Sequence, residues 1–197
     1  SGYIRDQTGS LAGSIRLSGT LPDSIRPAAA LAFLRHDISL SFREFGATLS
    51  RRGIALKDVN GSLSVNNDLV ADSLAFTFME QRFTVNAVMK NFFPWMAGGG
   101  QNLDISGDVH VDRLVTAALA PGEKEQHDST GASANLFPAD VNANILLKAD
   151  TLIFKNFKAT NFSSRLTYLP YVITFNEVYA NGLEGVLEGE LMLSKQQ

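Results

Sequence analysis

The chain of 197 residues contains no cysteine, so disulfides and thiolate metal sites are excluded. Charged residues are scarce, at 19% against about 25% in typical soluble domains. The net charge is −3 and the basic residues are scattered, with only Arg51 and Arg52 adjacent, which argues against nucleic-acid binding. No apolar run approaches the roughly 20 residues that a membrane-spanning helix needs. The 45% of hydrophobic residues must therefore form a core or an exposed apolar face.

Alternation of apolar and polar residues is the dominant pattern. Leu11, Ile15, Leu17 and Leu21 share one parity over residues 9–21, which is typical of strands with one buried face. Similar runs recur along the chain, whereas helical periodicity is rare. The sequence therefore predicts an all-β fold of mostly antiparallel, extended and curved sheet.

Turn signals divide these runs. Asn66-Asn67-Asp68 and Asn181-Gly182 predict turns, and the reversal between two phenylalanine-rich runs falls in residues 79–82. Asn60-Gly61 allows two interpretations, a tight type I′ hairpin turn or a glycine bulge within a longer strand. Pro22 and Pro27 bracket a further turn, and residues 28–35 fit a strand or a helical turn equally.

A short phrase occurs twice. Ile54-Ala55-Leu56-Lys57-Asp58-Val59 returns as Leu152-Ile153-Phe154-Lys155-Asn156-Phe157, and strand-like runs follow both copies. We therefore expect two related β units, residues 1–120 and 136–197, with strands in the second unit at 141–148, 152–169, 171–179 and 186–193. The polar stretch 121–135 should be a flexible linker. We expect one short helix before it, over 112–119, with Asp112 as its N-cap.

Catalytic signatures are not recognisable. His36, His110 and His127 are the only histidines. His110 has Asp108 and Asp112 two residues away on either side, a set that can bind a metal but is far more common on a solvated strand face. We therefore predict no catalytic residues, no metal and no cofactor.

Several phrases resemble the AsmA-like family of Gram-negative envelope proteins. The resemblance is carried by residues 136–152, by 175–191 with Asn181-Gly182-Leu183-Glu184-Gly185, by Met89-Lys90-Asn91-Phe92-Phe93-Pro94-Trp95, and by 107–114. Leu183-Glu184 departs from the family, which often has a more glycine-rich turn there. The resemblance implies a periplasmic module that is anchored at the inner membrane through a segment outside this chain. Because the chain begins without methionine, we expect it to be a piece of a longer protein. TamB-like and YhdP-like relatives imply a hydrophobic β groove that supports phospholipid transport or outer-membrane assembly, with phospholipid acyl chains and other envelope proteins as partners.

Phenylalanine is the residue type on which the functional interpretation depends. The chain has 13, and those expected to face lipid are Phe76, Phe78, Phe83, Phe154 and Phe175. The alternative is a β-sandwich that binds a protein partner, or acts in adhesion, and uses these side chains to fill its core. Alternation alone predicts both, because an open groove and a closed core have the same period of two.

Overall fold

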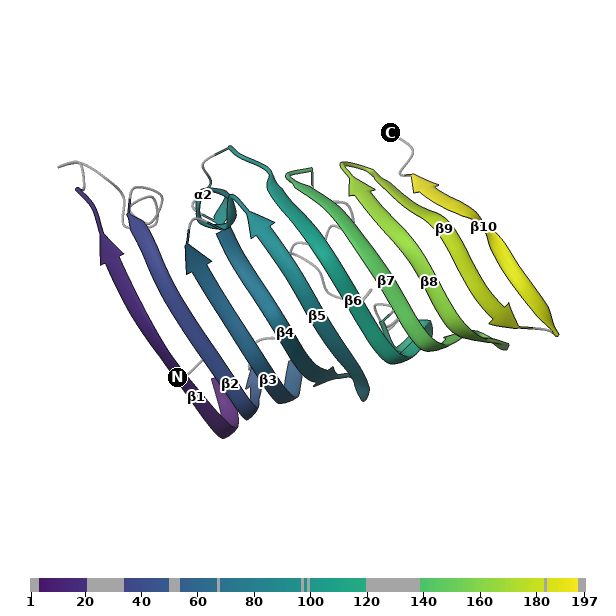
Figure 1. The fold of residues 1–197 in the computed structure, drawn as a ribbon, viewed down its shortest axis with the longest axis horizontal. Helices are drawn as coiled ribbons and strands as arrows, with labels where there is room; N and C mark the ends of the chain where they lie inside the picture. Colours follow the sequence, from purple (N-terminus) through teal and green to yellow (C-terminus); the bar gives the residue numbers. More distant parts are fainter. Residues whose placement is uncertain are drawn as a thin grey trace, which may run out of the picture.

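The computed structural model describes residues 4–20, 34–49, 54–66, 68–96, 98, 100–119, 139–182 and 184–194. The described residues form a single sheet of ten strands whose spatial order is the order of the chain, drawn from purple to yellow in Figure 1. The strands are β1 (Ile4–Ser18), β2 (Arg35–Leu49), β3 (Ile54–Asn66), β4 (Asp68–Phe78), β5 (Gln81–Lys90), β6 (Leu103–Val115), β7 (Val141–Phe154), β8 (Phe157–Leu169), β9 (Val172–Gly182) and β10 (Gly185–Ser194). The predicted all-β, mostly antiparallel fold is confirmed.

All neighbouring strands are antiparallel except β6 and β7, which pair in parallel from Leu103–Val141 to Val115–Ile153. A parallel pair needs a long crossover, and here the connection runs from residue 116 to 140. The predicted linker at 121–135 falls in this connection, outside the described residues. The predicted units therefore contribute β1–β6 and β7–β10 to one continuous sheet.

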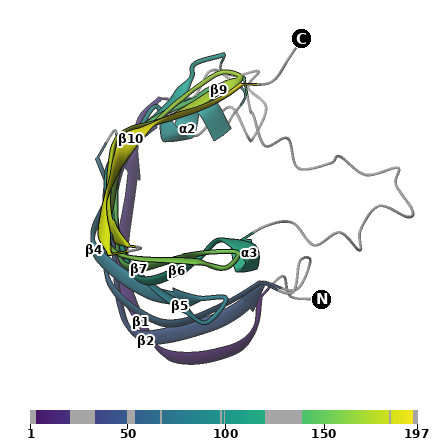
Figure 2. The same cartoon turned by 90° about the vertical axis from the view of Figure 1, so that its right-hand side faces the viewer.

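Seen edge-on, the sheet is bent into a C (Figure 2). Two short helices, α2 (Phe92–Met96) and α3 (Thr116–Leu119), lie on the inner side of the curve in this view. We call the inner face of the curved sheet the trough. Because no second sheet covers the trough among the described residues, the closed sandwich of the alternative interpretation is not the observed architecture.

The curvature coincides with irregular positions inside the strands. Six non-glycine residues in strand interiors have φ between 49° and 53°, next to register shifts: Asp6, Glu44, Asp58, Ser73, Asn161 and Glu177. An extra residue of this kind is a β-bulge, which bends its strand and increases the local twist. The bulges lie in β1–β4 and in β8–β9, on either side of the regular β5–β6–β7 pairings.

The structure decides between the two interpretations of Asn60-Gly61. Strand β3 runs through both residues, and its register with β4 shifts on either side of Asn60. Gly61 has φ of 117°, and a Cβ there would lie 2.4 Å from the carbonyl oxygen of Ser73. The pair is therefore a bulge, and glycine is required by both the φ and the close approach of β4.

Some predicted turns are confirmed. Asn66 ends β3 and Asp68 begins β4, and Gly182 and Gly185 flank the last turn. Met79 and Glu80, both with positive φ, form the two-residue turn between β4 and β5, which is the type I′ geometry that matches the twist of a hairpin.

Other boundaries were wrong. Lys155-Asn156 is the turn between β7 and β8, so the strands predicted at 141–148 and 152–169 are instead Val141–Phe154 and Phe157–Leu169. The two copies of the repeated phrase consequently lie in different places, one inside β3 and one across a hairpin turn. The helix predicted over 112–119 is limited to Thr116–Leu119, because β6 continues in register with β7 to Val115. Residues 21–33, which include Pro22 and Pro27, lie outside the described residues.

Candidate functional site: the apolar trough

Two complete rows of apolar or glycine residues cross the trough from β1 to β10. Successive register partners make up each row. The first row is Ile15, Ile38, Val65, Leu69, Met89, Ile105, Ala143, Tyr168, Ile173 and Leu193. The second row is Gly13, Leu40, Leu63, Ala71, Ala87, Gly107, Ile145, Leu166, Phe175 and Leu191.

The row between these two, on the outer face, has a different chemistry. Its members are Ser14, Ser39, Ser64, Val70, Val88, Ser106, Asn144, Thr167, Thr174 and Met192. Alternate residues of a strand point to opposite faces, so the sheet has one continuous apolar face and one largely polar face. Phe93 of α2 stacks on His36, which has the parity of Ile38, at 3.9 Å between ring centroids. Because α2 lies inside the curve (Figure 2), the apolar face is the trough.

Four of the five phenylalanines predicted to face lipid are half-buried strand residues of the trough. Phe76 and Phe83 are register partners on β4 and β5, and their rings stack with centroids 5.4 Å apart. Phe78 lies at the end of β4, and Phe175 belongs to the second row. Phe154 differs, because it is exposed at the end of β7 beside the Lys155-Asn156 turn.

The inner face is most buried at β6–β9. Val111, Ala149, Ala159 and Ala180 are at most 2% exposed and belong to one cluster with Leu114 and Phe162. Alanines dominate this floor, so neighbouring large side chains such as Phe83, Leu147 and Leu152 pack over it. This cluster is the described hydrophobic core, and it stabilises the centre of the sheet.

Towards both ends of the sheet the trough opens to solvent. Leu11, Ile15 and Leu17 on β1 and Leu187, Leu191 and Leu193 on β10 are between 46% and 65% exposed. Sequence reasoning noted the alternation of β1 but did not assign these six residues to the site, because it cannot tell an edge strand from a central one. The inner face is therefore exposed to solvent at both end strands and buried at its centre.

Two buried polar side chains in the trough form hydrogen bonds with backbone groups. Gln81, which is 4% exposed, accepts from the Val115 amide at 2.8 Å and donates to its carbonyl at 3.4 Å. Ser164, which is 1% exposed, donates to the carbonyl of Asn176 at 2.9 Å, next to the Glu177 bulge. Buried polar groups must be hydrogen-bonded, and these two compensate for irregular pairing.

Helix α2 closes part of one rim. Its five residues are all apolar, and Pro94 is tolerated because its missing N–H falls in the first turn. Trp95 donates its indole N–H to the carboxylate of Asp140 at 2.6 Å, which ties α2 to the beginning of β7. Near the same rim, burial raises the pKa of the Tyr168 phenol, with smaller contributions from Asp140 and Tyr171.

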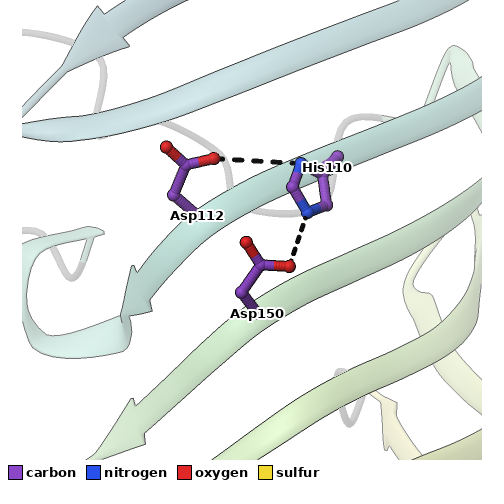
Figure 3. Close-up of polar contacts among 3 residues, drawn as sticks. All are labelled: His110, Asp112 and Asp150. Atoms are coloured by element: carbon purple, nitrogen blue, oxygen red, sulfur yellow. Dashed lines mark hydrogen bonds and ion pairs between the residues drawn. The ribbon is translucent and has the colours of Figure 1, made fainter.

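His110 has the parity of Ser106, so it lies on the outer face. Figure 3 shows its contacts with Asp112 and Asp150. Asp150 of β7 approaches the ring Nε2 at 2.9 Å, whereas Asp112 approaches Nδ1 at 3.9 Å. Asp108, which the sequence suggested as a partner, instead accepts a hydrogen bond from Asn86 at 3.2 Å. Asp150 was missed because only the parallel pairing of β6 with β7 brings it to His110.

Among the described residues, His110, Asp112 and Asp150 are the group that could hold a metal, with ligand atoms within 4.8 Å of one another. The two carboxylates approach different ring nitrogens, and one ion binds only one nitrogen of an imidazole. The geometry is thus that of a half-buried histidine hydrogen-bonded to an exposed carboxylate.

A second polar feature is a depression of about 500 Å³ lined by Thr8, Gly9, Glu44, Asp58, Asn60, Phe76, Thr77 and Arg82. Within it Thr77 donates to Asp58 at 3.4 Å. The depression follows the bulges of β2 and β3 at Glu44 and Asp58.

None of the described helices is long and apolar enough to cross a bilayer. Comparison with known proteins adds no relative: no protein-family model, curated protein or solved structure matches this chain.

Proposed function

We propose that this chain is a non-enzymatic, periplasmic module of an AsmA-like envelope protein and that its trough holds phospholipid acyl chains. In this proposal the parent protein is anchored at the inner membrane outside this chain. The module then supports lipid transport or outer-membrane assembly. The observation that carries the proposal is the pair of apolar rows that cross all ten strands without a charged residue.

The exposure of the trough ends favours a lipid as occupant. Soluble monomers rarely leave large contiguous apolar surfaces uncovered, and here both end strands do so. Each methylene group that moves from water into such a surface contributes about 0.8 kcal/mol. An acyl chain laid across several strands would therefore be held without a specific polar contact, which is consistent with a conduit.

The first test is lipid extraction and mass spectrometry on the chain purified from a Gram-negative host without detergent. We expect phospholipid in near-stoichiometric amount. A folded protein that carries no lipid would contradict the proposal and favour a protein partner as the occupant of the trough.

A matched pair of double variants tests whether the lipid lies in the trough. Leu187→Asp with Leu191→Asp places two carboxylates in the trough, and Val186→Asp with Met192→Asp places two on the outer face of the same strand. All four side chains are more than half exposed, so neither variant should unfold the sheet. Loss of lipid in the first variant only is expected, and equal loss in both would contradict a trough site.

Phe175→Asp extends the test to the second apolar row inside the trough, where Phe175 is flanked by Leu166 and Leu191. We expect a folded variant with less bound lipid, checked by circular dichroism and mass spectrometry together. An unfolded variant would instead identify Phe175 as a core residue.

A further inference from the structure

The connection between β5 and β6 is longer than the pairing of these strands requires. They are antiparallel neighbours, and such strands are usually joined by about 2–5 residues. Met79 and Glu80 alone join β4 to β5, whereas β5 ends at Lys90, β6 begins at Leu103, and α2 lies between them. The long connection therefore places α2 on the inner side of the curved sheet (Figure 2).

Two side-chain contacts hold α2 in this position. Phe93 stacks on His36 of β2 with the ring centroids 3.9 Å apart, and both side chains are buried. The indole N–H of Trp95 donates to the carboxylate of Asp140, directly before β7, at 2.6 Å. Because β3 to β6 lie between β2 and β7 in the sheet, the two contacts tie α2 to strands on either side of β5, the strand that precedes it.

The backbone on both sides of α2 has the conformation of a hinge. Asn91, directly before the helix, has φ of 61°, and Gly98 and Gly100 after it have φ of 73° and 70°. A Cβ at either glycine would meet no atom within 4 Å, so glycine supplies the left-handed conformation there and not a close approach. Hinges are typically a few residues of this kind at the ends of an element.

We propose that α2 is a hinged lid over the first apolar row of the trough. The lid is closed when Phe93 stacks on His36 and Trp95 binds Asp140, and it opens when both contacts are released. Val65 of the first row is 4% exposed although no second sheet covers it among the described residues, which is consistent with a cover by α2. Neither contact belongs to the backbone ladder, so opening need not separate any strands.

This inference rests on the proposed function and adds a regulation to it. With the lid closed, an acyl chain cannot enter or leave the first apolar row at this rim. With the lid open, the row is accessible there, so the rates of lipid uptake and release depend on the open fraction of α2.

Trp95 is the only tryptophan of the chain, so its fluorescence reports the position of the lid. Asp140→Ala removes the acceptor of the indole N–H and should raise the open fraction about tenfold, the effect of losing one hydrogen bond to a charged group. Acrylamide should then quench Trp95 more strongly than in the wild type. Asp150→Ala is the matched control, because Asp150 also contacts a ring nitrogen, that of His110 at 2.9 Å, but on the outer face.

Phe93→Leu tests the second contact, because leucine is apolar but cannot stack on His36. It should also increase the quenching of Trp95, whereas Met96→Leu, at a 50% exposed position of the same helix, should not. Circular dichroism checks that every variant retains the sheet. Equal quenching of Trp95 in the wild type, Asp140→Ala and Phe93→Leu would overturn the proposal.

Release of phospholipid connects the lid to the trough. The chain purified with its lipid is mixed with an excess of phosphatidylglycerol vesicles, and the lipid that stays bound is followed by mass spectrometry. Asp140→Ala should release lipid about tenfold faster than the wild type, and Asp150→Ala at the wild-type rate. Equal rates despite stronger quenching in Asp140→Ala would show that α2 moves without gating the trough, which also overturns the proposal. A wild type without bound lipid would instead contradict the proposed function, and the quenching of Trp95 would still decide whether α2 opens.

Discussion

The side-chain oxygen of Asn86 on β5 accepts a hydrogen bond from the backbone amide of Ser73 on β4 at 2.8 Å. Ser73 is a bulge residue with φ of 49°, so its amide has left the regular ladder. Asn60 on β3 does the same for the bulge residue Glu44 on β2, at 3.0 Å. In both places an asparagine of the next strand replaces the ladder bond that the bulge removes.

Asn86→Ala should lower the free energy of unfolding by about 0.5–1.5 kcal/mol, the usual net contribution of one hydrogen bond. The physical reason is that Ser73 N–H loses its partner, and Asp108 loses the donor at 3.2 Å. Urea denaturation measures the change. Asn144→Ala is the control, because the Asn144 side chain accepts only a 3.4 Å contact from Arg165; equal losses in the two variants would refute a special role for Asn86.

Gly107→Ala should cost about 1–3 kcal/mol, as overpacking commonly does. A Cβ at Gly107 would lie 2.0 Å from the carbonyl oxygen of Asn86, so β5 and β6 would have to separate. Thermal unfolding provides the measurement. Gly185→Ala, which meets no atom within 4 Å, should change stability by less than about 0.5 kcal/mol. A neutral Gly107→Ala would mean that the two strands are not in this close contact.

Gln81→Leu should destabilise the protein by about 1–3 kcal/mol, the cost of leaving buried polar groups unpaired. The Val115 amide and carbonyl would both lose their partner at the point where β6 ends. Hydrogen exchange should show faster exchange of the Val115 amide in the variant. Gln101→Leu, at an exposed position, controls for the change in side-chain type and should leave that amide unaffected.

Ionisation of the buried Tyr168 phenol should lower the stability of the folded protein at high pH. Burial raises the pKa of its phenol above the usual value, which is about 10. The folded state therefore holds the proton more tightly than the unfolded chain. The resulting stabilisation is complete below about pH 10 and is lost as the pH rises through the folded-state pKa.

Denaturation series over about pH 8–11 check this expectation. The wild type should lose stability more steeply at the alkaline end than Tyr168→Phe, which has no phenol to ionise. Tyr179→Phe removes an exposed tyrosine and should retain the wild-type slope. Identical slopes for the wild type and Tyr168→Phe would show that burial of this phenol has no effect on the pH dependence.

The strands could be predicted where a local signal decides. Period-two alternation with asparagine, aspartate or glycine at the ends identified the β3–β4 and β9–β10 turns. The Lys155-Asn156 turn was missed because a single asparagine is a weak turn signal, and the corresponding Lys57-Asp58 of the repeated phrase lies in a bulged strand. Helix α2 was missed because proline indicates an interruption, although a first helical turn accepts it.

The candidate site could not be predicted in full, because its arrangement depends on long-range contacts that local sequence patterns do not contain. Phe76, Phe83 and Phe175 were expected to face lipid, but alternation could not show whether a second sheet covers them. The approach of Asp150 to His110 depends on a parallel pair joined across residues 116–140. Long-range pairing of this kind leaves no periodic signal in the chain.

The asparagines that hold the bulges face outwards, whereas the trough is lined by other residues of the same strands. Curvature and lining are consequently encoded by separate sets of positions. Substitution of one apolar lining residue by another can therefore change the side-chain volume on the inner face without flattening the sheet. The same separation would let an engineer re-line the interior, for example at Leu166 or Phe175, while the outward-facing Asn60 and Asn86 preserve the shape.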